Sequence, residues 1–164
     1  MAISYENVIY DRVIESLSSI IADEFSMPIY YDAHEGNQSF LITPVSDELN
    51  ETLTTAQVRD YTVNLAYQVD LGGNYTKLTL KTVSEVAERV KRLIYNNRNY
   101  EVSGSRKFNN ANVSSIEYAR DEDNPYLVSA SMDVNVSVME VIGWNIKQKQ
   151  VIENLMIVRI FTHF

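Results

Sequence analysis

The chain contains no cysteine, only five glycines and only three prolines among its 164 residues. The absence of cysteine excludes disulfides, thiol nucleophiles and thiolate metal sites, so the fold must be held together by burial of apolar side chains. Five glycines leave little material for phosphate-binding loops, and the patterns G-x-x-x-x-G-K-[ST], G-x-G-x-x-G and G-x-S-x-G are all missing. These absences argue against nucleotide chemistry and give no support for an enzyme.

Basic residues are scarce as well, with 14 Lys and Arg against 22 Asp and Glu and a net charge of −8. Residues 1–82 hold 12 acidic and 4 basic side chains, whereas residues 83–164 hold 10 of each. Net negative charge disfavours non-specific attraction to a phosphate backbone. The uneven division predicts two unlike surfaces on one molecule.

Long apolar runs and a basic leader are missing too. No stretch approaches the ~20 apolar residues of a membrane span, and the first residues, MAISYENVIYDRV, are acidic where a signal peptide is basic. We therefore expect a soluble, intracellular product without membrane contact. The length and the 45% hydrophobic content predict one globular domain over residues 1–164.

Metal and cofactor sites also find no support in the sequence. The two histidines, His34 and His163, have no ligand cluster nearby and are expected in solvated or packing roles. The acidic run at 121–124 lacks the glycine of a calcium loop, and Met132 stands where the twelfth, acidic ligand would be. We therefore expect a turn there, and no metal or cofactor.

The first half of the chain predicts one helix, one hairpin and one loop. Apolar residues recur at threes and fours over residues 3–25, which predicts an amphipathic helix ended by Pro28. Two β-rich runs, residues 27–33 and 38–44, flank a glycine-containing connection and predict a hairpin. Residues 45–58 show no periodicity and predict a long acidic loop.

Strict alternation of apolar and polar residues marks the remaining strands. Residues 60–71 predict a strand with one covered face, ended by Gly72 and Gly73. A capping box at Thr82 to Glu85 predicts a helix ending near residues 96–97, and residues 99–110 predict a mobile polar segment. The last segments predict a long hairpin around the turn at 119–125 and a final strand; these are residues 112–119 with 126–141, and residues 150–164.

Together these elements predict an α+β fold. The sheet is mixed and mostly antiparallel, two main helices pack on one of its faces, and a long β-hairpin is added.

Two charged groups are the candidates for an interaction surface. The first is the only cluster of basic residues in the sequence, Arg89, Lys91, Arg92, Arg98, Arg106 and Lys107. This cluster either contacts an acidic partner or phosphate, or is simply a solvated helix face followed by a charged segment. The predicted loop carries Asp47, Glu48 and Glu51.

The order of elements resembles that of the tail terminator, or tail completion, proteins of long-tailed bacteriophages. The resemblance covers about residues 8–138 and rests on VIYDRVIESLSSII, YTVNLAYQVDL, VSEVAERVKRLIYN and the pair VSSIEYA and YLVSASMDVNVSV. It implies a non-enzymatic virion protein of the tail or neck, assembled in the host cytoplasm. The subunit would pack its helices on one face of the sheet and close into a homohexameric ring. That ring would cap the tail tube and dock the head-side connector.

A ring of this kind needs two different patches that meet between neighbouring subunits. Given the ring that the resemblance implies, we hypothesise that Asp47, Glu48 and Glu51 contact Arg89, Arg92 or Arg98 of a neighbouring subunit.

The resemblance also defines the expected partners. These are further copies of the chain, the tail tube protein, the neck or connector protein and, in a tail that has one, the sheath protein. DNA would pass through an acidic lumen without specific binding, because six copies would carry 6 × −8 = −48 charges. The long segment 45–58 and the addition 139–164 depart from a compact member of this family.

Three alternatives stay open at this point. A neck or head-completion protein shares the size, the acidity and the mixed pattern. A ligand-binding or catalytic α+β domain would use Tyr67, Asp70, Arg89 or the acids at 121–123. A nucleic-acid binder would use Arg98, Arg106 and Lys107, against the global charge.

Overall fold

The computed structural model describes residues 6–70 and 79–141. In this part of the chain six strands form one sheet, in the order β1-β2-β3-β6-β5-β4, which curls as a half-barrel. Four long strands lie between two short edge strands: Ile29–Tyr30 (β1), Gln38–Thr52 (β2), Ala56–Asp70 (β3), Tyr100–Val102 (β4), Ser105–Arg120 (β5) and Leu127–Val141 (β6). Of the described pairs, β1 with β2 is parallel and the others are antiparallel. The predicted α+β fold is confirmed.

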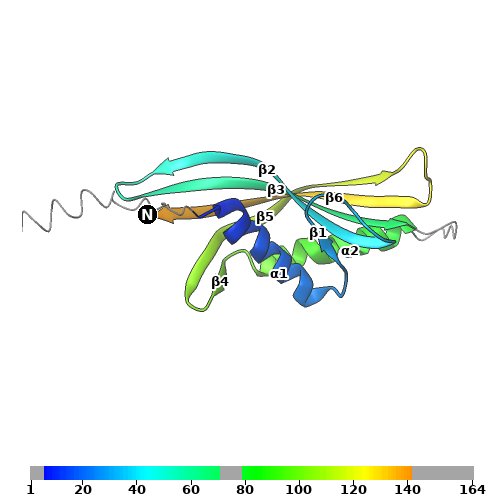
Figure 1. The fold of residues 1–164 in the computed structure, drawn as a ribbon, viewed down its shortest axis with the longest axis horizontal. Coiled ribbons are helices and arrows are strands. Elements are labelled where there is room, and N and C mark those ends of the chain that lie inside the picture. Colours follow the sequence, from blue (N-terminus) through cyan, green and yellow to red (C-terminus); the bar gives the residue numbers. More distant parts are fainter. Residues whose placement is uncertain (1–5, 71–78, 142–164) are drawn as a thin grey trace, which may run out of the picture.

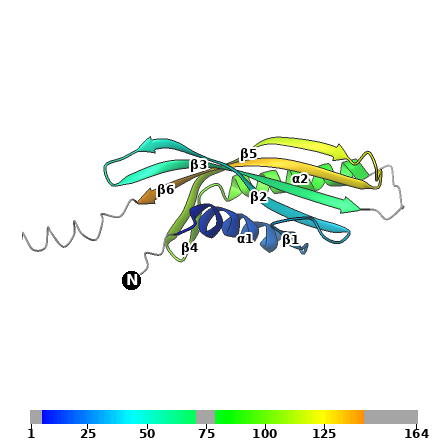
Figure 2. The same cartoon turned by 45° about the horizontal axis from the view of Figure 1, so that its top comes forward.

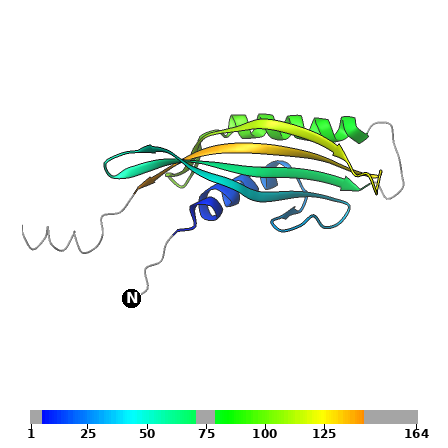
Figure 3. The same cartoon turned by 90° about the horizontal axis from the view of Figure 1, so that it is seen from above.

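Two helical segments cover one face of this sheet and leave the other bare (Figure 1). A π-helical segment, Ile9–Ile14 (η1), continues as α1, Glu15–Glu24, and the backbone turns extended at Phe25. The second helix, α2, spans Thr79–Asn96. Seen from above, α2 runs beside β5 while α1 lies toward β2 (Figure 3). The predicted helix at 3–25 is confirmed from η1 onward; residues 3–5 lie outside the described part.

The helix α2 begins earlier than the sequence predicts. Residues 79–81 are already helical, so Thr82 lies inside the helix and the predicted capping box is wrong. Ser84 Oγ donates a hydrogen bond to the Lys81 carbonyl at 2.8 Å, as hydroxyls inside helices do. The predicted helix end near residues 96–97 is confirmed.

The core lies in a single layer between the helices and the sheet. From α2, the buried stripe is Val83, Ala87, Val90 and Ile94, at a helical period. From the sheet, every second residue of the two central strands is buried, namely Tyr61, Val63, Leu65 and Tyr67 of β3 and Val128, Ala130, Met132, Val134, Val136 and Val138 of β6. The alternation of apolar and polar residues over 60–70 and 126–141 therefore predicted correctly which face of β3 and β6 is buried.

The predicted hairpin of residues 27–33 with 38–44 is wrong. Strand β1 runs parallel to β2, with Ile29 opposite Phe40, and β2 instead pairs antiparallel with β3. This pairing puts the Phe40 ring 5.2 Å from the Tyr67 ring and 5.3 Å from the Phe25 ring, measured between centroids. Burial of this aromatic group decides the pairing over the local turn signal.

The predicted mobile segment at 99–110 is also wrong, because it forms β4 and the start of β5. Ser103 and Gly104 make the turn with positive φ angles of 51° and 78°, a conformation that glycine adopts without strain. Phe108 is buried and stacks on Tyr100 at 5.6 Å between ring centroids. This aromatic pair anchors a segment whose other residues are mostly polar.

The long hairpin predicted around 119–125 is confirmed as β5 and β6, with β5 beginning earlier, at Ser105. Asp121 Oδ1 accepts hydrogen bonds from the backbone N–H groups of Asp123 and Asn124, which makes 121–124 the expected turn. The predicted strand at 150–164, His163, and the glycine pair that ends the strand predicted at 60–71 lie outside the described residues.

Candidate interaction surfaces

The tip of the β2–β3 hairpin, residues 45–58, projects beyond both helices, and we call it the arm (Figure 2). The prediction of a loop here is wrong: β2 continues to Thr52 and pairs with β3 up to Gln57. Two register shifts, between Pro44 and Ser46 and between Leu49 and Glu51, break the alternation that would have indicated a strand. Most of these side chains are exposed, so the sequence also lacks the regular spacing of apolar residues that a buried strand face would produce.

The three acidic residues of the arm differ in their surroundings. Asp47 accepts a 2.6 Å hydrogen bond from Arg59 Nε of the same hairpin. Glu48 lies opposite Asp60, and Glu51 opposite Val58, on the face that no helix covers. Neither Glu48 nor Glu51 forms an ion pair with any described residue. Two free carboxylates are therefore displayed on one side of the arm.

Exposed apolar side chains accompany these carboxylates. Val45, Leu49 and Leu53 expose 59%, 54% and 41% of their surfaces. Met139 and Val141, at the end of β6 beside the arm, expose 50% and 76%. Clustered exposed apolar side chains on a projecting element are typical of protein–protein contact sites.

The predicted basic group is divided by the fold. Arg89 pairs with Glu24 of α1 and lies over the Phe25 ring at 4.9 Å. Arg106 lies 3.6 Å from a Glu101 carboxylate oxygen and donates to Asn109. Lys91 pairs with Glu88 one turn before it. These three cations thus have partners within the chain.

The other cations of that group form no described ion pair; they are Arg92, Arg98 and Lys107. The Arg98 guanidinium lies over the Tyr95 ring at 5.3 Å, and Tyr95 exposes 61% of its surface. Next to them a groove of about 410 Å³, which we call the α2–β5 groove, is lined by Lys91, Arg92, Tyr95, Asn96, Asn112 and Val113. Its lining carries two cations and no acid.

The bare face of the sheet is a polar network. Asn64 Nδ2 donates to Ser131 Oγ at 2.8 Å and to Asp133 Oδ1 at 3.0 Å, and Thr62 Oγ1 donates to Asn135 at 3.1 Å. The paired positions on this face carry six acids, Glu48, Glu51, Asp60, Asp70, Glu117 and Asp133, and the bare-face positions of β3 and β6 hold no lysine or arginine. A polar trough of about 340 Å³ crosses four strands here, from Glu48 to Asn112.

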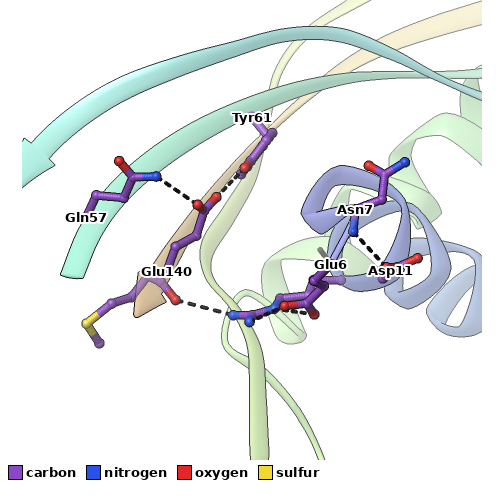
Figure 4. Close-up of polar contacts among 8 residues, drawn as sticks. Glu6, Asn7, Asp11, Gln57, Tyr61 and Glu140 are labelled. Atoms are coloured by element: carbon purple, nitrogen blue, oxygen red, sulfur yellow. Dashed lines mark hydrogen bonds and ion pairs between the residues drawn. The ribbon is translucent and has the colours of Figure 1, made fainter. Parts of the chain in front are cut away.

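A second polar cluster joins the N-terminal helix to the base of the arm (Figure 4). The Glu140 carboxylate accepts hydrogen bonds from the Tyr61 hydroxyl and from Gln57 Nε2. Arg12 donates to Glu6 and to the Met139 carbonyl, so it bridges η1 and β6. Burial and the neighbouring carboxylate raise the pKa of Tyr61, and the hydrogen bond from Arg12 lowers the pKa of Glu6. This cluster was not predicted, because its members lie far apart in the sequence.

The remaining candidates show no reactive arrangement. His34 shares a 2.8 Å hydrogen bond with Ser39, and burial lowers the pKa of its ring. Tyr67 accepts a 2.6 Å hydrogen bond from Gln38, and the two residues Tyr67 and Asp70 lie on opposite faces of β3. Among residues 6–70 and 79–141, no three acidic or histidine side chains gather as a metal site, and no helix there is long and apolar enough to cross a membrane.

Within one chain, the structure does not bring the two predicted charged groups together. The free acids Glu48 and Glu51 lie on the bare face of the arm, while Arg89, Arg92 and Arg98 belong to α2 and the turn after it, on the covered face. The sequence matches no protein-family model and no curated protein.

Proposed function

We propose that the chain is a structural subunit that closes into a ring, as a phage tail terminator that caps the tail tube and presents a docking surface to the head side. The observation that carries the proposal is the sheet with two free edges. Strand β1 covers only Phe40 and Leu41 of β2, so the described chain leaves β2 unpaired on its outer side from Ile42 onward. Strand β4 covers β5 up to Phe108, and the Ala111 N–H donates to the Arg98 carbonyl, so among the described residues no strand pairs with the outer side of β5 from Asn112 onward.

Two different open edges on opposite sides of one sheet suit head-to-tail association. An isologous contact would use the same patch twice, whereas a contact between unlike patches repeats from subunit to subunit and gives a ring when the rotation closes. The helices lie on one face only, so a ring could present the polar bare face to its lumen. Acidic and amide side chains on that face would let DNA pass without adhering to it.

The test is the mass of the purified chain in solution, with electron microscopy of the same sample. Six 18.8 kDa chains are expected to give a particle of about 113 kDa with a central hole. A chain that stays at 18.8 kDa at its highest soluble concentration would contradict the proposal. A compact dimer without a hole would contradict it as well.

A further inference from the structure

The arm and the α2–β5 groove are complementary in both charge and polarity. The arm displays Glu48 and Glu51 without ion-pair partners among the described residues, together with exposed Leu49 and Leu53. The groove displays an aromatic wall at Tyr95 and a cation, Arg92, that forms no ion pair within 4 Å among the described residues, with Arg98 stacked on that tyrosine. The acids and leucine side chains of the arm thus match the cations and the aromatic ring of the groove.

The two surfaces cannot meet within one chain. In the sheet, β2 and β5 are separated by β3 and β6, a distance of about 14 Å at the usual strand spacing. Glu48 and Glu51 also face the bare side, while α2 lies on the covered side. The arm projects past the helices, so no described helix lies between its tip and a neighbouring molecule (Figure 2).

We infer that the occupant of the α2–β5 groove is the arm of a second copy of this chain. Leu53, at the tip of the arm, packs against Tyr95 and Val113, and Glu48 and Glu51 pair with Arg92 and Arg98. The inference rests on the proposed function only in requiring a second copy. It also revises the predicted pairing, since Asp47 and Arg89 already have partners in their own chain.

Charge reversal tests the contact in trans. One variant carries Glu48→Arg and Glu51→Arg, and the other carries Arg92→Glu and Arg98→Glu. Each variant alone should fold but lose assembly, because like charges then meet at every interface. An equimolar mixture should assemble again, because each reversed arm meets a reversed groove and each native arm meets a native groove. Only alternating subunits satisfy both pairings.

Matched reversals at exposed sites elsewhere serve as controls. Glu122→Arg changes an exposed acid in the β5–β6 turn, and Lys81→Glu changes a cation in the first turns of α2 whose exposed ion pair contributes little. Both should assemble as the unmodified chain does. Circular dichroism of each variant confirms that folding is retained before assembly is compared.

Cross-linking gives a second, independent measurement. The chain has no cysteine, so Leu53→Cys combined with Tyr95→Cys introduces its only thiols. Oxidation should give a ladder of disulfide-linked oligomers, whereas Glu122→Cys combined with Tyr95→Cys should give none. The ladder does not depend on ring closure.

The outcomes separate this inference from the proposed function. Two results would contradict the contact between arm and groove without contradicting the ring. One is a ring that gives no disulfide-linked ladder, and the other is assembly by either charge-reversed variant on its own. A ladder without closed rings would support the contact and overturn the ring. The contact would also be contradicted if each charge-reversed variant loses assembly and an equimolar mixture of the two does not restore it.

Discussion

Glu140 shows how one residue joins distant parts of the chain. It accepts hydrogen bonds from Tyr61 and Gln57 of β3, and the preceding carbonyl accepts one from Arg12 of η1 (Figure 4). Removing one of these donors destabilises the folded protein, because an oxygen of the partly buried carboxylate is then left without a hydrogen-bond partner. The base of the arm is thereby fixed to the N-terminal helix.

Tyr61→Phe tests that role. The substitution removes the hydroxyl that donates to Glu140 and keeps the ring in the core, so we expect the free energy of unfolding to fall by about 1–2 kcal/mol. Denaturation in urea measures the change. Tyr118→Phe, at a tyrosine that exposes 45% of its surface, is the control and should change little. Equal stabilities for Tyr61→Phe and the unmodified chain would contradict the assignment.

At the scale of the element, burial decides what the sequence can predict. Over 60–70 and 126–141 one face is buried, so alternation marks both strands and their orientation. The stripe from Val83 to Ile94 marks α2 in the same way. In the arm only Ala56 is buried and two register shifts break the alternation, so the sequence carries no periodic signal.

Pairing partners were harder to predict than elements. The connection at 34–37 indicated a hairpin, but the Phe40 contacts with Phe25 and Tyr67 require β2 to pair with β3. The charged candidates were found by composition alone. Which of them pair within the chain, as Asp47 and Arg89 do, depends on distances that no local pattern contains.

Shortening the arm tests whether it is a separable element. Leu49 and Arg59 lie opposite each other, so residues 50–58 can be replaced by Asn-Gly, which favours a two-residue hairpin turn. The change removes one buried residue, Ala56, and the hydrogen bond from Gln57 to Glu140, and leaves the rest of the core in place. We expect a cooperative thermal unfolding transition with self-assembly lost. Circular dichroism and solution mass measure the two properties. A shortened chain that still assembles would show that the arm is not an assembly contact.

For the whole molecule, charge is distributed by face. Among the described residues, the bare face carries Glu48, Glu51, Asp60, Asp70, Glu117 and Asp133, while the cations of the basic group that form no ion pair, Arg92, Arg98 and Lys107, belong to α2, the turn after it and β5. A net charge of −8 adds a general repulsion of polyanions. The molecule thus has a repellent surface and a separate, locally basic one.

We therefore expect no measurable binding of duplex DNA at physiological salt. Fluorescence anisotropy of a labelled duplex measures this directly. As a comparison, Glu117→Lys with Asp133→Lys places cations on the bare face and should produce binding at low salt that weakens steeply as salt rises. Salt-dependent binding by the unmodified chain would favour a nucleic-acid role through Arg98, Arg106 and Lys107.

The β5–β6 turn at 121–126 lies at the opposite end of the molecule from the arm (Figure 1). Glu6 and Asn7 lie beside Glu140 at the arm end, where β6 also finishes. An affinity handle fused near either of those sites would crowd the arm and could mask its contacts. The turn instead offers an insertion point for a purification tag or a fluorescent label that leaves the arm unobstructed.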